Sequence, residues 1–568
     1  MKASDLFVRC LEQEGTELIF AVPGEENLDL LESLRTSAIR VVVNRHEQAS
    51  AFMAAAYARL TGKVGVCLAT LGPGATNLVT GVAHAQLSGV PLLAITGQKG
   101  IRGNWQADFQ MIDVVGMMKP ITKRTVQLQD PKTVPMQVRE AFKVATTERL
   151  GACHIELPED VANEEVPDEY RPLVPGEARR PVPERCAVAR AAALIRRARH
   201  PILIVSSRGQ RRRVHAALRA FCDATNLYVI HTQLGKGALG DDHPNSLFAF
   251  GAHRHDHLNA IVDRVDLIVT VGYSTNEYPP RLWNPGMDKT IVRIDFSPAT
   301  TQVHYNPRME LIGDIATTLD LLREELGDYR FDGAALARLR EEFTRRLFVE
   351  GADDPAFPLR PRRIVAECRR ALGRAGIISM DNGIYKLWFS RHYPTYEIGT
   401  FLLDNSLATM GAGMPAAMAA KLVRPEQRVL AVAGDGGFLM SSQELETAVR
   451  LGIGVVVLIL NDNGFGFVKW EQRSHGFPDF ALDLGNPVFC RLAESYGARG
   501  VCIHSADELA PALEAAFTSG APTLIECPID YSENAGVWVH EECDSGGPPE
   551  GLPPPQPGSA GWNEEGGA

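Results

Sequence analysis

Short apolar runs that alternate with helix-type patterns restrict the fold of this chain more than any other feature. In the first 165 residues the runs occupy positions 18–21, 41–44, 64–68 and 92–96. Helical patterns with Gly or Pro at their ends separate these runs. Because a strand that is buried on both faces of a parallel sheet needs a continuous apolar run, the alternation predicts an α/β fold with doubly wound parallel sheets.

The same alternation starts again twice, which predicts three domains in the 568 residues. The further runs are 201–206, 227–231, 266–272, 291–296, 376–380, 428–433, 455–460 and 523–527. A Pro-, Glu- and Arg-rich stretch at 166–185 is typical of an extended linker, and the charged helical pattern 336–347 ends the second group. We therefore expect domains at 1–165, 186–345 and 358–540, and a disordered tail rich in Gly and Pro at 543–568.

Composition and charge argue against several classes of partner. The net charge is -11 and the basic runs are short, so the chain lacks the positive surface expected of a nucleic-acid-binding protein. The longest strongly apolar stretch, 452–460, is far shorter than the roughly 20 residues of a membrane-spanning helix. The ten cysteines include no Cys-x-x-Cys pair, and the N-terminus is polar. We expect a cytoplasmic protein with no nucleic-acid or membrane partner.

Two carboxylates directly follow predicted strands in the third domain. One lies in Gly434-Asp435-Gly436-Gly437 and the other in Asn461-Asp462-Asn463-Gly464. Open α/β sheets bind ligands at the carboxyl ends of their strands, and Mg²⁺ prefers a few carboxylate or carbonyl oxygens together with substrate phosphates. Glycine also lets backbone N–H groups approach a phosphate closely. The pair predicts a site for Mg²⁺ and a diphosphate; the alternative is that Asp435 only caps a helix and that the second segment is a turn.

A competing motif lies at Gly411-Ala412-Gly413-Met414-Pro415-Ala416, which loosely matches the dinucleotide-binding fingerprint. Asp435 follows it at about the spacing of the acid that binds the ribose. No clear strand precedes Gly411, and Pro415 constrains the turn. An NAD-dependent dehydrogenase therefore stays an alternative that the motif supports only weakly.

The Gly-Asp-Gly segment, followed after about 24 residues by Asn461-Asp462, resembles the thiamine diphosphate (ThDP)-binding motif. This resemblance implies that Asp435, Asp462 and the backbone carbonyl of Gly464 ligate Mg²⁺. It also implies that the first domain binds the pyrimidine ring of ThDP and the third domain the diphosphate. The positions expected to contact the cofactor are Gly383, Ile384, Tyr385, Ala408, Met410, Gly434, Asp435, Gly436, Gly437, Asp462, Gly464 and Phe465.

The segment 41–49 resembles the strand-to-helix connection that carries the catalytic glutamate of ThDP enzymes, and it places Glu47 in that role. A carboxyl group hydrogen-bonded to the aminopyrimidine ring promotes the proton transfer that activates the cofactor. Read without the resemblance, Glu47 would be an acid at the start of a solvated helix. Met410 would separate the two cofactor rings, and the carbonyl of Ala408 would accept a hydrogen bond from the amino group.

Longer matches at 22–27, 71–77, 94–98 and 154–160 resemble acetolactate synthase large subunits. Gln110 stands where these synthases keep a glutamine near the reacting centre, and Glu25 where pyruvate decarboxylase-like relatives carry a catalytic acid. The paired histidines of those decarboxylases have no counterpart around 103–110. The resemblance implies a carboligase that decarboxylates a 2-oxo acid, with pyruvate expected from the family, and adds the product to a second carbonyl. A simple 2-oxo acid decarboxylase and a non-catalytic ThDP-binding protein are the alternatives.

Two further expectations come from the resemblance. The segment 271–278 is similar to the catabolic synthases that lack a flavin, so we expect no FAD. In this family the glutamate domain of one subunit faces the diphosphate domain of another, which implies a homodimer or a homotetramer. The segment 467–480 follows the expected metal loop and is predicted to line the substrate pocket with Phe467, Trp470 and Glu471.

Overall fold

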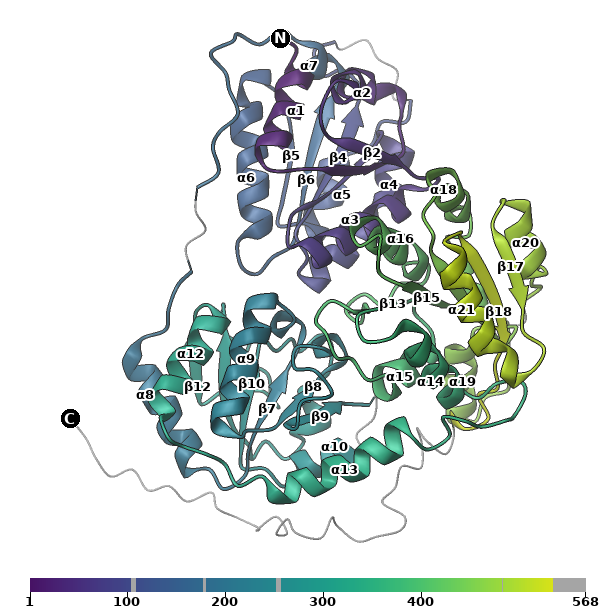
Figure 1. Cartoon of the computed structure of the whole chain (residues 1–568). Coiled ribbons are helices and arrows are strands. Elements are labelled where there is room, and N and C mark those ends of the chain that lie inside the picture. Colours follow the sequence, from purple (N-terminus) through teal and green to yellow (C-terminus); the bar gives the residue numbers. More distant parts are fainter. Residues whose placement is uncertain (104–108, 177–179, 252–256, 483, 535–568) are drawn as a thin grey trace. The chain divides into compact units, whose positions relative to one another are not determined.

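The computed structural model describes residues 1–103, 109–176, 180–251, 257–482 and 484–534 (Figure 1). These residues form three sheets of six strands each, and every pairing between neighbouring strands is parallel. Helices between successive strands cover the sheets, so the predicted α/β fold is confirmed. The predicted tail at 543–568 lies outside the described residues. Among the described helices, none is both long and apolar enough to cross a bilayer.

The first sheet has the strand order β2-β1-β3-β4-β6-β5. Its strands are β1 (Leu18–Ala21), β2 (Arg40–Val43), β3 (Gly65–Ala69), β4 (Leu92–Gln98), β5 (Arg124–Gln127) and β6 (Ala152–Pro158). Its helices are α1 (Ala3–Gln13), α2 (Leu28–Arg35), α3 (Glu47–Thr61), α4 (Gly72–Ser88), α5 (Val114–Met118), α6 (Val134–Thr146) and α7 (Glu159–Asn163). Alternate strand residues face opposite sides, so that Phe20 packs with α3 and α4 whereas Ile19 packs with α1 and α6.

The second sheet has the strand order β12-β11-β10-β7-β8-β9. Its strands are β7 (Pro201–Val205), β8 (Val229–His231), β9 (Ser246–Ala249), β10 (Leu267–Val271), β11 (Thr290–Asp295) and β12 (Met309–Ile312). Its helices are α8 (Arg185–Arg197), α9 (Arg212–Thr225), α10 (His257–Val262), α11 (Pro280–Trp283), α12 (Ile315–Leu326) and α13 (Ala334–Phe348). One hydrophobic core joins α8, α9 and α12 to the sheet, and a second core joins α13 to its other face.

The third sheet repeats the connectivity of the first, with the order β14-β13-β15-β16-β18-β17. Its strands are β13 (Ile377–Met380), β14 (Phe401–Leu402), β15 (Val429–Gly434), β16 (Val456–Asn461), β17 (Arg499–Cys502) and β18 (Thr523–Pro528). Its helices are α14 (Pro361–Leu372), α15 (Tyr385–His392), α16 (Gly413–Val423), α17 (Asp435–Leu439), α18 (Glu444–Leu451), α19 (Gly466–Ser474), α20 (Phe489–Ser495) and α21 (Leu509–Ser519). In both the first and the third sheet the chain reverses its direction of winding beside the first strand, which creates a crevice for ligands at the carboxyl ends of the strands.

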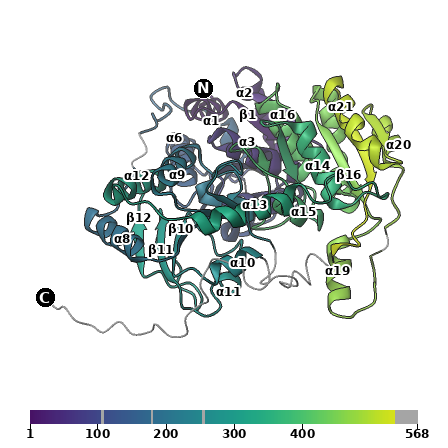
Figure 2. The same ribbon diagram turned by 60° about the horizontal axis from the view of Figure 1, so that its bottom comes forward.

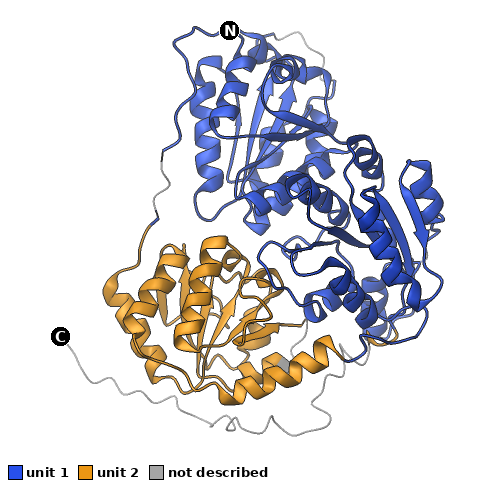
Figure 3. Ribbon diagram, in the orientation of Figure 1, with its two compact units in different colours: residues 1–180, 350–531 blue, residues 181–349, 532–568 orange. Residues whose placement is uncertain are grey.

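The chain divides into two compact units, which Figure 3 distinguishes by colour. Residues 1–180 and 350–531 form one unit, which therefore contains both the first and the third sheet. Within it α3 packs against α16, and the two helices lie side by side in Figures 1 and 2. Both helices are rich in buried alanine, and these small side chains belong to one continuous hydrophobic core. The second unit, 181–349 with the segment from 532 onward, contains the second sheet.

Candidate active site

Glu47 is the first residue of α3 and lies at the carboxyl end of β2. Its side chain is buried, with Oε2 accepting a hydrogen bond of 2.9 Å from Nδ2 of Asn77 on α4. A Cβ at Gly74 would lie 3.3 Å from Oε1 of Glu47, so the glycine leaves the carboxylate uncovered on that side. Asn77 therefore holds Oε2 of Glu47 in place, while Oε1 of Glu47 faces Gly74, which has no side chain. This is the arrangement expected of a carboxyl group that is reserved for a ligand.

Glu444 of α18 fixes the turn that leads into Glu47. Oε1 of Glu444 accepts hydrogen bonds from the backbone N–H groups of Arg45 at 3.0 Å and His46 at 2.9 Å. Oε2 accepts from Nδ2 of Asn44 at 3.1 Å. Burial raises the pKa of Glu444, and these hydrogen bonds oppose that shift by stabilising the ionised form. Glu444, at the start of a helix that covers the third sheet, thus positions Glu47 beside the first sheet. No sequence motif indicated this role for Glu444.

The turn between β3 and α4 brings the other two predicted catalytic residues towards Glu47. A Cβ at Gly72 would overlap the backbone oxygen of Gln110, and a Cβ at Gly24 would overlap Thr70. The backbone of Gln110 and the segment that leads into Glu25 therefore touch the same turn, whose next residues contact Glu47. The side chains of Gln110 and Glu25 are both exposed. Their catalytic roles stay predictions.

Glu26, the neighbour of Glu25, is the buried acid of this segment. It accepts a hydrogen bond of 2.6 Å from the hydroxyl of Thr70 and forms an ion pair of 2.6 Å with Lys99. These interactions lower the pKa of Glu26 and oppose the effect of its burial. Glu26 therefore serves to hold the β1 and β3 ends together, while Glu25 stays accessible from solvent.

Asp435 follows β15 and is almost completely buried. Its Oδ1 accepts a hydrogen bond from the backbone N–H of Gly436 at 2.9 Å. Its Oδ2 accepts from the N–H of Gly464 at 3.1 Å and from Nδ2 of Asn486 at 2.6 Å. Burial nevertheless raises the pKa of Asp435, because these hydrogen bonds offset only part of the cost of removing the ionised carboxylate from water. The two segments that the sequence analysis paired are thus joined directly through Asp435 and Gly464.

Asp462 follows β16, the strand that pairs with β15. Burial and the charge of Asp435 raise the pKa of Asp462 to about 7, while Lys469 acts in the opposite direction. Among the described residues no group of three or more His, Cys, Asp and Glu side chains has metal-binding geometry, so a cation here would need backbone or phosphate oxygens as well. Two carboxylates with few other charged ligands match the preference of Mg²⁺ for partial coordination by protein and the rest by phosphate. The residues present therefore fit a Mg²⁺–diphosphate group.

Asn486 holds this pair of loops together and was not found from the sequence. Besides Asp435, its Nδ2 lies 3.1 Å from Oδ1 of Asn461 and 3.2 Å from Oδ1 of Asn463. Asn461 in turn donates a hydrogen bond of 2.9 Å to Oε1 of Glu526 on β18. Asn486 lies in a segment without a motif, and no signal in the sequence pointed to it.

The turn 382–385 lies against the Gly-Asp-Gly segment. A Cβ at Gly434 would lie 3.1 Å from the ring of Tyr385, and one at Gly466 would lie 3.3 Å from Cγ2 of Ile384. Burial and the neighbouring carboxylates raise the pKa of the Tyr385 hydroxyl well above its usual value, so the side chain is neutral. The structure thus places Ile384 and Tyr385 beside the predicted diphosphate site. Gly383 has no room for a side chain because its Cβ would overlap the Tyr385 ring.

The predicted cofactor contacts Gly436, Gly437 and Phe465 lie in or beside the Gly-Asp-Gly turn. A Cβ at Gly436 would lie 2.8 Å from the ring of Phe465, and a Cβ at Gly437 would lie 3.0 Å from Oδ1 of Asp381. Neither position therefore accommodates a larger residue without a shift of its neighbours. Glycine at both positions therefore lets Phe465 and Asp381 pack directly against the backbone of this turn.

Asp381 anchors the loop that carries Ala408 and Met410. Its carboxylate accepts hydrogen bonds from the backbone N–H groups of Gly411, at 2.9 and 3.0 Å, and Gly413, at 3.0 Å. Ala408 has a positive φ of 56°, and its N–H donates to Asp404 at 3.0 Å. The loop is thus tied to the crevice between β13 and β15, where ligands bind in sheets of this topology.

The same hydrogen bonds count against the dinucleotide alternative. A dinucleotide fingerprint presents free backbone N–H groups to a pyrophosphate, whereas those of Gly411 and Gly413 are already bonded to Asp381. The preceding strand, β14, ends at Leu402, well before the glycines. Both observations weaken the case for NAD at this position.

The segment 467–480 is largely exposed. Phe467 is 39% exposed and its ring centroid lies 5.7 Å from that of Trp470. Phe477 and Phe480 are 61% and 77% exposed. Its predicted role as a wall of the substrate pocket stays a prediction. Exposed aromatic side chains next to the metal loop are typical of a surface that another molecule covers.

Comparison with known proteins shows which family has this architecture. Residues 1–117 match "Thiamine pyrophosphate enzyme, N-terminal TPP binding domain", residues 188–322 the corresponding central domain, and residues 381–527 the C-terminal TPP binding domain. "Acetolactate synthase" of Bacillus subtilis (strain 168) is 34% identical over 542 residues, covering 94% of each chain. "Acetolactate synthase, catabolic" of Raoultella terrigena is 33% identical over 94% of this chain and 95% of its own. "Acetolactate synthase isozyme 2 large subunit" of Escherichia coli (strain K12) is 30% identical over 95% and 97%.

Proposed function

Because this chain belongs to the thiamine pyrophosphate enzymes, in the family of the acetolactate synthase large subunits, we propose that it is a Mg²⁺-dependent carboligase that uses pyruvate as its donor. It would decarboxylate the 2-oxo acid and join the two-carbon product to a second carbonyl compound. The observation that carries the proposal is the pair of carboxylates at the carboxyl ends of adjacent strands, the buried Asp435 and the partly buried Asp462.

Each part of the site has a chemical role in this proposal. Asp435, Asp462 and the carbonyl of Gly464 would hold Mg²⁺, and the cation would offset part of the negative charge of the two carboxylates and of a diphosphate. Glu47 offers its uncovered carboxylate oxygen to the pyrimidine ring and holds or releases a proton there, while Asn77 keeps the side chain in place. When bound, thiamine diphosphate supplies the nucleophilic carbon and accommodates the negative charge left by the departure of CO₂.

A homodimer or a larger homo-oligomer is part of the proposal. The support from the structure is the group of exposed apolar side chains that follows the metal loop. Its members are Phe467, Val468, Phe477 and Phe480. Several exposed apolar side chains in one segment are characteristic of surfaces that are covered in an assembly, and a second copy of this chain would cover them here.

One incubation tests the proposed reaction. Purified protein is mixed with pyruvate, ThDP and Mg²⁺, and the products are separated into acetolactate and acetaldehyde. We expect acetolactate as the main product. Acetaldehyde alone would make the protein a decarboxylase, and unchanged pyruvate would contradict pyruvate as the donor. A parallel sample with a chelator and no Mg²⁺ should form neither product.

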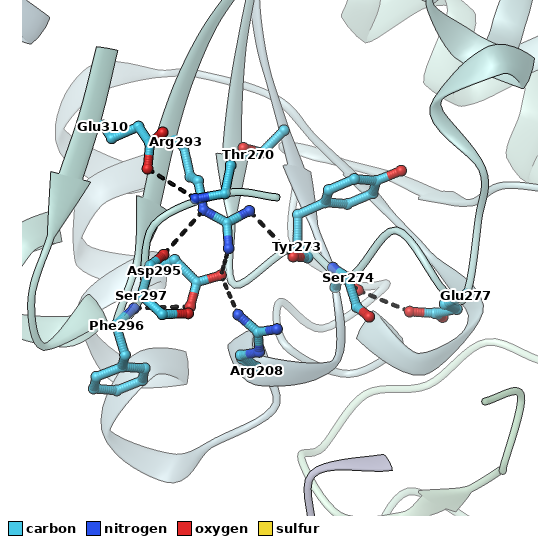
Figure 4. A network of polar contacts seen from close by, with 12 residues as sticks. Arg208, Thr270, Tyr273, Ser274, Glu277, Arg293, Asp295, Phe296, Ser297 and Glu310 are labelled. Carbon is cyan, nitrogen blue, oxygen red and sulfur yellow. Dashed lines mark hydrogen bonds and ion pairs between the residues drawn. The ribbon is translucent and has the colours of Figure 1, made fainter. Parts of the chain in front are cut away.

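The proposed enzyme works without FAD, and the second sheet supports this. Its topological switch point lies between β7 and β10, where dinucleotides bind in sheets of this order. Figure 4 shows Arg208 and Arg293 both directed at Asp295 in this region. Asp295 is fully buried, and Arg293 contacts it at 2.7 Å. The charged side chains at the ends of these strands therefore form ion pairs with one another and are not free to bind a flavin nucleotide.

A second buried cluster lies at the ends of β7 and β8. Glu277 accepts hydrogen bonds from the hydroxyl groups of Ser206 at 2.7 Å and Thr232 at 2.8 Å. To reach these groups, a flavin nucleotide would have to displace buried hydrogen bonds that the protein already makes within itself, which is costly.

We therefore expect the purified protein to be colourless. Its absorption spectrum should show no flavin band, and added FAD should leave both the reaction rate and the melting temperature unchanged. A bound flavin in the denatured supernatant would contradict this prediction.

The ratio of products should depend on Gln110. Its backbone contacts Gly72 in the turn beside Glu47, and in the proposed reaction its exposed side chain orients the acceptor. We expect Gln110→Ala to lower the ratio of acetolactate to acetaldehyde, because orientation favours the bimolecular step most strongly. Affinity for Mg²⁺ and ThDP should hardly change.

Gln13→Ala is the matched control, since Gln13 is an exposed glutamine of the same domain at the end of α1. Its product ratio should equal that of the unmodified protein. A Gln110→Ala variant with weaker cofactor binding and an unchanged ratio would show that Gln110 has been assigned the wrong role.

A further inference from the structure

Cys490 and Cys502 form a pair of neighbouring thiols on one side of the third sheet. Cys490 lies in the first turn of α20 and Cys502 is the last residue of β17. Their sulfur atoms are 2.7 Å apart, and both side chains are partly exposed. The helix approaches the strand this closely because a Cβ at Gly500 would overlap the backbone oxygen of Cys490. The glycine therefore makes the contact between the sulfurs possible.

The pair is connected to the proposed metal site through a series of hydrogen bonds. Sγ of Cys502 lies 3.7 Å from Oε2 of Glu526, whose Oε1 accepts a hydrogen bond of 2.9 Å from Asn461. Oδ1 of Asn461 contacts Nδ2 of Asn486, which also holds Asp435 at 2.6 Å. Cys490 also follows Asn486 closely in the chain. A change at the sulfurs therefore acts on Asn486 from both directions.

We propose that Cys490 and Cys502 are a redox-sensitive site, and that the reversible disulfide between them weakens the binding of Mg²⁺ and ThDP. The second part of the proposal rests on the proposed function. The disulfide requires an S–S distance of about 2.0 Å, so the two sulfurs need to approach each other by only about 0.7 Å. Small displacements of α20 are enough to form the bond.

The oxidant in this proposal is a peroxide. The Cys490 thiolate attacks one peroxide oxygen, the O–O bond breaks, and a sulfenic acid and a hydroxide ion result. The hydroxide takes up the proton that the Cys490 thiol had released and becomes the first water. The sulfur of Cys502 then attacks the sulfenic sulfur, the S–O bond breaks and a second water leaves with the Cys502 proton. Two thiols and one hydrogen peroxide thus give one disulfide and two waters. The S–H group of Cys502 points at Sγ of Cys490, and burial and the neighbouring sulfur raise the pKa of Cys502, so we assign the first attack to Cys490.

Oxidation removes the S–H group that Cys502 directs at Glu526. It also draws the start of α20 towards β17, and with it the segment that carries Asn486. Both changes disturb a residue that orients Asp435 from outside the metal site. Loss of such an outer partner typically lowers metal affinity by about 10- to 100-fold, so we expect about a tenfold weaker affinity in the oxidised protein.

The other cysteines in the described part of the chain lack this combination of proximity and access. Cys368 and Cys527 interact electrostatically with each other, but both are buried. Cys186 is exposed, and the contact that its sulfur makes is with the carboxylate of Glu184 at 3.4 Å. Cys186→Ser is therefore a suitable control for general oxidation at the surface.

The test compares the full-length protein after treatment with hydrogen peroxide or with dithiothreitol. Peptide mapping under non-reducing conditions should find Cys490 joined to Cys502 in the oxidised sample, and dithiothreitol should reverse the bond. Calorimetric titration with ThDP in excess Mg²⁺ should give about a tenfold higher dissociation constant for the oxidised sample. Cys186→Ser should behave in the same way.

Cys490→Ser and Cys502→Ser provide the matched variants. Neither variant should form the linked peptide, and peroxide should not change the affinity of either variant for ThDP in excess Mg²⁺. Two free thiols after oxidation would overturn the proposal, and a disulfide with unchanged affinity would overturn its coupling to the metal site. Because mapping needs no cofactor, a protein that forms the disulfide but binds no ThDP when reduced would contradict the proposed function instead.

Discussion

Glu47→Gln is expected to lower the rate of pyruvate consumption by the ~10²- to 10⁴-fold that is typical of a lost general acid–base group. Glutamine has the shape of glutamate and can still accept the hydrogen bond from Asn77, so α3 should keep its position. It has no carboxylate to share a proton with a ring nitrogen. The loss should therefore appear in turnover, while Mg²⁺-dependent binding of ThDP stays close to normal.

Steady-state kinetics and calorimetry on the same preparation separate these two effects. Glu32→Gln is the matched control, because Glu32 is an exposed glutamate of the same domain, paired with Arg35 on α2. It should have normal turnover. A Glu47→Gln protein with a near-normal rate would refute the catalytic assignment. A large fall in melting temperature would assign the effect to folding.

Asp435→Ala is expected to abolish measurable binding of ThDP at micromolar concentrations in the presence of Mg²⁺. Loss of an outer-shell partner already costs about 10- to 100-fold in metal affinity, and Asp435 is proposed as a direct ligand. The substitution also leaves the N–H groups of Gly436 and Gly464 without their acceptor. Asp462→Ala should have the same direction of effect, because the diphosphate again loses its bridging cation.

Calorimetric titration measures this loss, and thermal melting without cofactor shows whether the variants are folded. Asp507→Asn is the control, since Asp507 is an aspartate of the same domain that is 94% exposed. Its affinity should match that of the unmodified protein. A folded Asp435→Ala variant with unchanged affinity would show that Mg²⁺ is held elsewhere.

The interior strands of the three sheets, with the exception of β6, were predictable from the sequence. All of the predicted runs became strands, because a strand covered by helices on both faces must be apolar along its length. The unpredicted strands β5, β12 and β17 are edge strands with partly exposed side chains, so their apolar pattern is weak. β9 and the two-residue β14 are also edge strands, and both are short.

β6 was missed for a different reason. It is buried throughout, yet it contains His154 and Glu156. His154 lies between the hydroxyl groups of Thr96 and Thr125, and Glu156 accepts hydrogen bonds from two glutamine amides. The partners that make polar residues tolerable inside a sheet come from neighbouring strands, and a local sequence pattern cannot identify them.

The sequence by itself determined the α/β class and the local motifs of the site, because strand burial, the Gly-Asp-Gly turn and the start of α3 depend on residues that are close together in the chain. The tertiary structure alone decided what holds those motifs in place. Glu444 orients the turn before Glu47 from about 400 positions away, and Asn486 joins the two loops that carry Asp435 and Asp462. Such contacts depend on the packing of α3 against α16 and on the parallel pairing of β15 with β16. A periodic pattern reports which face of an element is buried, but not which distant side chain will lie against it.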